Sequence, residues 1–151
     1  MRIAGKWHTC NDGINRPIVE TSVLSATGQP VFERFLVDSC ADCTVLSADV
    51  LQRLQLNGQT PPAGLSLKGI SGAGNYVVVN TVVEFLHADG GPARVRGVMA
   101  AFTDPTATDL SILGRDVLDH FDVIISRRRN EVLLLAENHH YLVSPVNPNG
   151  R

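Results

Sequence analysis

Residues 35–47, which read FLVDSCADCTVLS, contain two sets of side chains that could carry out chemistry. Cys40 and Cys43 are spaced as C-x-x-C, a pattern found in redox motifs and in half of a zinc site. Asp38 ends an apolar run and is followed by Ser39, and a carboxylate in that position could act as a general base toward water. The rest of the sequence must therefore indicate whether the thiols or the carboxylate carry the function.

The C-x-x-C spacing on its own is a weak indication of a redox or metal site. A redox pair usually lies where a strand meets a helix, because the helix N-terminus lowers the pKa of the first thiol. Here residues 44–46 (TVL) follow the second cysteine and favour a strand. Zinc would need two further ligands, and the pairs at positions 8 and 10 or 139 and 140 would supply them only by accident of folding. We therefore expect two buried thiols and no metal, with the metal and redox functions as minor alternatives.

Composition is typical of an ordinary soluble protein. The 151 residues suffice for one domain whose core needs no disulfide. The net charge of −2 and the 5% aromatic content argue against nucleic acid or an anionic membrane as a partner, and the arginines at 127–129 are expected to be a solvated turn. The N-terminus lacks the apolar core of a signal peptide, and no apolar run of about 18 residues follows. We therefore expect a cytoplasmic protein with reduced cysteines.

Glycine and proline divide the chain into short β-branched segments, which predicts an all-β class, mainly β with two short helices. Strands over 16–25 and 31–37 are expected to form a hairpin. Helices are expected over 48–56, for which Ser47 is a suitable N-cap, and within 114–121. Further β segments are expected over 43–47, 75–85, 93–102, 122–126 and 131–136.

Three segments that lie far apart in the sequence support the carboxylate function. The first is the strand end and turn around Asp38, with residues 41–46 (ADCTVL) following it. The second is the glycine-rich segment 69–74 (GISGAG), which is expected to form a hairpin, and the third is the apolar run 112–118 (ILGRDVL). Each has an ordinary explanation when taken alone, since an aspartate after a strand usually caps a turn.

Taken in order, these segments resemble the retropepsin family, the single-domain aspartic proteases of retroviruses and their cellular relatives. The resemblance opens with Arg16-Pro17-Ile18-Val19 and extends over roughly residues 16–136. It implies the acid-protease fold, a closed β-barrel that forms half of a symmetric dimer. We expect an N-terminal extension over 1–15, the protease domain over 16–137 and a flexible tail over 138–151.

The resemblance implies that Asp38 is the catalytic residue. Amide hydrolysis needs a base that activates water and an acid that protonates the substrate, and two carboxylates that share one proton supply both. The chain has a single D-S-x-A segment, so the second aspartate must come from a twin. We expect a homodimeric aspartic endopeptidase that cleaves extended peptide or protein substrates without a cofactor, best at mildly acidic pH. Apolar subsite walls are expected from Val45, Ile70 and residues 101–105.

The resemblance also assigns roles to neighbouring residues. Ser39 would hydrogen-bond across the dyad, and Asp42 with Arg115 would form a structural ion pair beneath the site. The active-site loop would comprise Ser39, Cys40, Ala41 and Asp42. The flap, which closes over the bound peptide, would comprise Gly69, Ile70, Ser71, Gly72, Ala73 and Gly74.

Cys40 departs from the family pattern, which has glycine at this position. Glycine leaves space for the opposing carboxylate and the substrate backbone, whereas cysteine adds a thiol to each copy. The alternative function is therefore a catalytically weak or inactive relative that binds peptides or only dimerises. A further hypothesis is an intersubunit disulfide between the two Cys40 residues, which requires Cα atoms within about 7 Å of each other.

Overall fold

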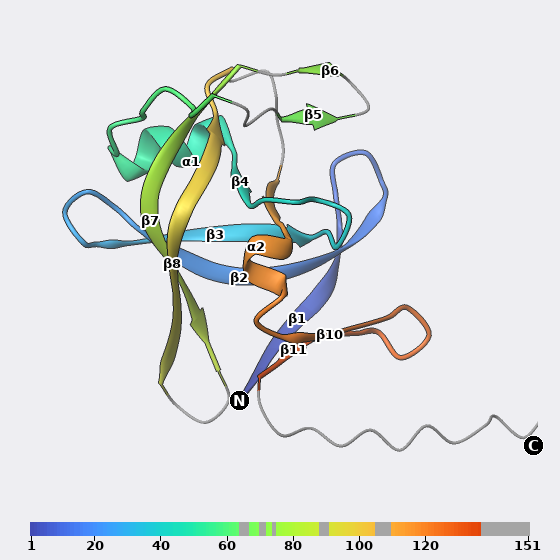
Figure 1. The fold of residues 1–151 in the computed structure, drawn as a ribbon. Coiled ribbons are helices and arrows are strands. Elements are labelled where there is room, and N and C mark those ends of the chain that lie inside the picture. Colours follow the sequence, from blue (N-terminus) through green and yellow to red (C-terminus); the bar gives the residue numbers. More distant parts are fainter. Residues whose placement is uncertain (64–66, 70–71, 74, 88–90, 105–109, 137–151) are drawn as a thin grey trace, which may run out of the picture.

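The described part of the computed structural model comprises residues 1–63, 67–69, 72–73, 75–87, 91–104 and 110–136 (Figure 1). The expected tail, residues 138–151, lies outside these residues. So do three residues of the expected flap, namely Ile70, Ser71 and Gly74.

The described residues form eleven strands and two short helices. In chain order they are β1 (Arg2–Thr9), β2 (Asn15–Leu24), β3 (Pro30–Val37), β4 (Val45–Leu46), α1 (Ala48–Leu54), β5 (Lys68–Gly69), β6 (Gly72–Ala73), β7 (Tyr76–Leu86), β8 (Pro92–Phe102), β9 (Ser111–Leu113), α2 (Arg115–Leu118), β10 (Asp122–Ser126) and β11 (Glu131–Leu135). The expectation of a mainly β fold with two short helices is confirmed.

Nine strands form one sheet in the order β10-β11-β1-β2-β3-β9-β4-β8-β7, and a further pairing joins β2 to β7. That pairing runs through Ser22↔Glu84 and Val23↔Val83. It closes a circuit of six strands, which are in order β2, β3, β9, β4, β8 and β7. Figure 1 shows the long β7–β8 hairpin crossing the β2–β3 hairpin, with α1 beside it. Most core residues lie on the strands of this circuit and on α1, and the core continues to Ile3 of β1 and to Val132 and Leu134 of β11.

Successive side chains of a strand point to opposite faces of the sheet, and the apolar side chains on the inner face form the core. In the expected hairpin, Val19 and Val23 of β2 and Phe35 of β3 are fully buried. Phe85 of β7 is also fully buried and meets Phe121 edge to face, with ring centroids 5.7 Å apart. Each such side chain contributes about 1.5–3 kcal/mol on burial, so closing the sheet on itself is favourable.

Helix α1 is shorter than the expected span of 48–56. Ser47 caps it as expected, since its hydroxyl accepts a hydrogen bond from Val50 N at 3.3 Å. The helix ends at Leu54 because Gln55 adopts a left-handed conformation with φ 53°. Val50 and Leu54 are fully buried, so the helix presents one apolar face to the core.

The first residues of the chain form a strand that the sequence analysis did not anticipate. The first half of β1 pairs with β11, from Arg2↔Leu135 to Gly5↔Val132. Its second half pairs with β2, from Lys6↔Ile18 onward. Part of the segment 1–15 therefore belongs to the sheet, while the domain boundaries given above remain predictions.

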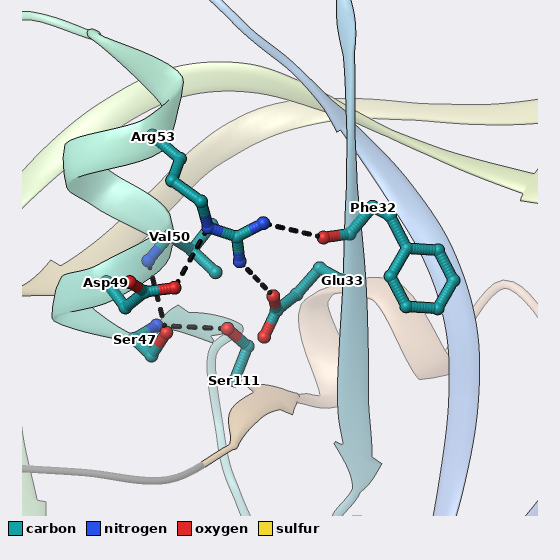
Figure 2. Close-up of polar contacts among 7 residues, drawn as sticks. All are labelled: Phe32, Glu33, Ser47, Asp49, Val50, Arg53 and Ser111. Carbon is teal, nitrogen blue, oxygen red and sulfur yellow. Dashed lines mark hydrogen bonds and ion pairs between the residues drawn. The ribbon is translucent and has the colours of Figure 1, made fainter.

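A polar cluster joins the start of β3 to α1 and β9 (Figure 2). The guanidinium of Arg53 donates to the Phe32 carbonyl oxygen at 3.1 Å, to Glu33 Oε2 at 2.9 Å and to Asp49 Oδ2 at 2.9 Å. Ser47 N donates to Ser111 Oγ at 3.0 Å. Burial raises the pKa of Glu33, an effect larger than the opposing effects of Ser111 and Arg53. The cluster therefore fixes α1 against the two strands that lead to Asp38 and Gly114.

Candidate active site

Asp38 follows directly on β3 and is held by backbone contacts. Its amide donates to the Leu113 carbonyl oxygen at 3.2 Å, which continues the parallel β3–β9 register Val37↔Leu113. Its carboxylate accepts from Cys40 N at 2.9 Å, and its carbonyl accepts from Ala41 N at 3.2 Å. The turn therefore sets both the position of this aspartate and the direction of its half-buried side chain.

The turn at Gly114 packs directly against the Asp38 loop. Arg115 N donates to the Ala41 carbonyl oxygen at 2.9 Å. A Cβ on Gly114 would lie 2.3 Å from the Cys43 carbonyl carbon and 2.5 Å from its oxygen, which no side chain tolerates. Glycine is thus required here by the close approach of two backbones.

Thr44 and Asp116 connect the same two segments through polar contacts around the buried Thr44 side chain. Asp116 Oδ1 accepts from Thr44 N at 2.8 Å and from Thr44 Oγ1 at 2.7 Å, and Thr44 Oγ1 accepts from Gly114 N at 3.1 Å. Thr44 has no exposed surface. The sequence analysis assigned neither residue a role, although polar side chains next to the apolar residues 45–46 and 117–118 were the available signal.

Asp42 and Arg115 form an ion pair across the same two loops. Arg115 Nη2 lies 2.5 Å from Asp42 Oδ1, while the side chains are 54% and 84% exposed. The contact joins the two residues that the sequence analysis paired, and its structural role stays a prediction. At this exposure the pair contributes little, about 1 kcal/mol at most, to folding.

The three carboxylates of this region differ in what they bind. Asp42 is engaged by the Arg115 side chain, and Asp116 by the backbone and hydroxyl of Thr44. Within the described part of the chain, Asp38 is the one of the three whose carboxylate meets only a backbone amide. Asp38 is therefore the carboxylate left available for chemistry in a single copy.

The thiols are arranged differently from the expectation of two buried groups. Cys40 is exposed and Cys43 is half-buried, and both are free thiols. Cys40 is exposed because it lies within the turn that follows Asp38, and its backbone does not adopt a positive φ, so the conformation does not require glycine. Burial, together with Asp116 and Asp42, raises the pKa of Cys43, which disfavours a reactive thiolate.

Among the described residues, no group of three His, Cys, Asp or Glu side chains is placed to bind a metal ion.

A cavity of about 370 Å³ lies beside β3 and β9. Its lining includes Leu36, Leu110, Ile112, Arg34, Asp12 and Arg16. Leu36 pairs with Ile112 and precedes Asp38 by two residues, so strand alternation directs Leu36 and Asp38 to the same face. Arg16 donates to both carboxylate oxygens of Asp12, at 2.8 and 2.6 Å, and this contact lowers the pKa of Asp12 to about 2.

Two residues expected to line subsites are buried instead. Val45 is 5% exposed and Ala101 is fully buried, because β4 and β8 pair as neighbouring strands of the closed circuit. Ile70, the third expected wall, lies outside the described residues.

The expected flap is described only in part. β5 and β6 pair antiparallel through Lys68↔Ala73 and Gly69↔Gly72, and Figure 1 draws this small hairpin apart from the main sheet. Its function as a flap remains a prediction.

Residues 22–117 match the family model of the aspartyl proteases. Because this match covers more than half of the chain, the protein belongs to the aspartyl protease family. A search of curated proteins finds no match.

Solved structures that resemble this chain include three proteases or protease-like domains. A retropepsin-like aspartic protease from Rickettsia conorii is 15% identical with a TM-score of 0.55, and the alignment covers 89% of this chain and 90% of that one. The EIAV protease in complex with the inhibitor HBY-793 is 22% identical with a TM-score of 0.47, covering 69% and 86%. The retroviral protease-like domain of Ddi1 from Leishmania major is 16% identical with a TM-score of 0.45, covering 80% and 96%. The retropepsin-like fold expected from the sequence is confirmed.

No helix in the described ranges has the length and apolar character needed to cross a membrane.

Proposed function

We propose that the protein is an aspartic endopeptidase in which Asp38 from each of two copies forms the catalytic dyad. The observation that carries the proposal is the unequal use of the three site carboxylates. Asp42 and Asp116 are engaged by side chains of their own chain, whereas Asp38 is oriented by a backbone amide alone. One copy therefore offers one catalytic carboxylate, and the reaction needs two.

The chemistry requires the two aspartates to share one proton, because two adjacent carboxylates do not both ionise. The ionised Asp38 accepts a proton from water while the water oxygen attacks the peptide carbonyl carbon. The protonated Asp38 donates its proton to the carbonyl oxygen, which gives a neutral tetrahedral intermediate. When this intermediate collapses, the C–N bond breaks and the leaving nitrogen takes a proton from the protonated Asp38, while one hydroxyl gives its proton to the ionised Asp38, so that a carboxyl group forms and the dyad keeps one proton.

The proposed substrate is an extended peptide bound along the face that carries Asp38. The cavity formed by Leu36, Leu110 and Ile112 offers an apolar floor on this face, and its charged rim includes Arg34. A substrate side chain next to the cleaved bond would occupy it. The segment 69–74 would act as the flap.

Cys40 supports a second candidate, a peptide-binding or dimerising relative without activity. Its side chain is exposed two residues after Asp38, on the loop that a second copy must approach. Two such thiols would occupy space that the dyad and the substrate need. The choice between the two candidates depends on this residue.

Peptide cleavage by the parent, Asp38→Asn and Cys40→Gly proteins tests the proposal. We expect cleavage by the parent near mildly acidic pH and a loss of at least about 10³-fold in Asp38→Asn, because the amide cannot act as a base. The isosteric change leaves the turn acceptor for Cys40 N in place, so circular dichroism should match that of the parent. Cleavage that survives in Asp38→Asn contradicts the mechanism. Cleavage by neither the parent nor Cys40→Gly supports the inactive relative.

A further inference from the structure

β8 has one open edge along its first part. On one side the strand pairs with β7 along its whole length. On its other side it pairs with β4, and only through Ala100 and Ala101. Within the described residues, no backbone hydrogen bond is made on this second side between residues 92 and 98. An edge of this kind leaves peptide groups available to another strand.

The backbone groups that face the open edge are those of Arg94, Arg96 and Val98. Ala100 N donates to the Thr44 carbonyl oxygen at 3.2 Å, so the backbone groups of Ala100 point away from β7. Backbone groups of successive residues alternate between the two sides of a strand, and the β7–β8 register has no bulge. Every second residue before Ala100 therefore directs its amide and carbonyl to the open edge. We call the amides of these three residues the edge amides.

A cavity of about 380 Å³ lies along this edge. Residues 93–96 of β8 line one side of it, and Met1, His120, Phe121 and Ala136 also line it. Figure 1 shows the N-terminus and the end of β11 near the first part of β8. The Phe121 side chain is half-buried and gives the cavity an apolar surface. The cavity therefore combines unpaired backbone groups with apolar side chains, which suits an added strand.

We propose that residues 139–143 of the same chain add to β8 as a further strand along this edge. The described chain ends at Ala136, which lines the cavity, and residues 137–151 follow it. The segment 139–143 reads HHYLV, in which tyrosine and valine favour a strand. Pro145 has no amide to donate and limits the strand to the residues before it.

The length of the segment fits the edge. Five extended residues span about 17 Å, and the seven residues 92–98 span about 23 Å. Residues 137 and 138 remain as the link from β11 to the added strand. The inference goes beyond the proposed function and does not depend on it, because it concerns one copy of the chain and no catalytic group.

Charge also favours this segment as the occupant. Arg94 Nε donates to Glu84 Oε2 at 2.7 Å, whereas the exposed Arg96 has no ion-pair partner within the described residues. Glu137 is the next residue after Ala136, and consecutive Cα atoms are about 3.8 Å apart. Its carboxylate is therefore within reach of the cavity rim, where it would pair with Arg96.

Amide hydrogen exchange of the full chain, followed residue by residue by NMR, tests the inference. We expect the edge amides to exchange slowly in the parent, because the added strand accepts their hydrogen bonds. In the double variant Tyr141→Asp with Leu142→Asp they should exchange at least about tenfold faster. Neighbouring side chains of a strand point to opposite faces, so one of the two new carboxylates meets the apolar cavity whichever face is turned to it.

Two controls make this comparison specific. The amides of Val95 and Gly97 face β7 by the same alternation, so they should stay protected in both proteins and show that β8 is intact. Val146→Asp with Asn147→Asp adds the same charge beyond Pro145 and should exchange like the parent. Edge amides that exchange freely in the parent, as a flexible tail over 138–151 would allow, overturn the inference. Protection that the first double variant leaves unchanged also overturns it.

A mixed sample separates the chain's own segment from that of a second copy. Isotope-labelled Tyr141→Asp with Leu142→Asp protein is mixed with an excess of unlabelled parent. We expect the edge amides of the labelled protein to stay unprotected, because its own segment cannot dock. Protection that returns in the mixture shows that a second copy supplies the strand, and overturns pairing within one chain.

Charge exchange tests the assigned ion pair. Arg96→Glu and Glu137→Arg should each speed exchange of the edge amides several-fold, because like charges then meet at the cavity rim. The two substitutions together should restore the protection seen in the parent. A combined variant that exchanges as fast as the single variants contradicts the proposed position of the segment.

Discussion

Thr44 and Asp116 are 72 residues apart in sequence, yet one carboxylate oxygen accepts both the backbone amide and the hydroxyl of the threonine. The same hydroxyl accepts the amide of Gly114 at 3.1 Å. These contacts connect the loop after Asp38 to the turn that precedes α2. The candidate site is therefore held by the polar contacts of the buried Thr44 as well as by strand pairing, and the exposed Asp42–Arg115 pair is secondary to them.

We predict that Thr44→Val destabilises the protein by about 2–4 kcal/mol. The change keeps the shape of the side chain but leaves the buried Gly114 amide without an acceptor and removes a bond to a charged carboxylate. Urea unfolding measures the effect. Thr21→Val is the matched control, because the Thr21 hydroxyl is buried without a hydrogen-bond partner and its removal should cost little. Equal losses in the two variants would contradict the role given to Thr44.

Gly114→Ala should destabilise the protein by about 3 kcal/mol or more. The new Cβ would lie 2.3 Å from the backbone carbonyl carbon of Cys43, in the bend before β4, and relieving this contact would require the two backbones to move apart. Gly97→Ala is the control, since a Cβ there has no neighbour within 4 Å. Thermal unfolding of the two variants should separate them clearly, and similar midpoints would contradict the close approach seen at Gly114.

Arg115→Gln should change the free energy of unfolding by less than about 1 kcal/mol. Its ion pair with Asp42 is well exposed, and the Arg115 amide keeps its bond to the Ala41 carbonyl oxygen whatever the side chain. Addition of salt should reduce the small difference further. A large loss of stability would show that the pair supports the fold and not only the loop surface.

Glu33 should make stability depend on pH in a defined direction. Its pKa is raised above 4.5 by burial, so the folded chain holds this proton more tightly than the unfolded chain. The stabilisation is complete below about pH 4.5 and is lost as pH rises through the folded-state pKa. The difference in unfolding free energy between parent and Glu33→Gln, measured by urea unfolding from about pH 4 to about pH 7, should shift in favour of the glutamine variant. A difference that does not vary over this range would show that Arg53, its partner in Figure 2, compensates for burial.

Local sequence patterns were enough to predict most elements. Alternation predicted the β2–β3 hairpin, and Ser47 predicted the start of α1. The end of α1 was misplaced by two residues because Gln55 has no sequence signal for the left-handed conformation that ends the helix. β1 was missed because its pairing with β11 joins the two ends of the described chain.

The sequence by itself determined the mainly β class, the two helices and the aspartate that closes β3, because these depend on short-range periodicity and on side chains that cap turns. Tertiary structure alone decided that Thr44 meets Asp116, that Cys40 is exposed and that Val45 is buried. These properties depend on which strands become neighbours across the closed circuit. Which strands become neighbours depends on the packing of the whole core, and this cannot be read from any single segment of the sequence.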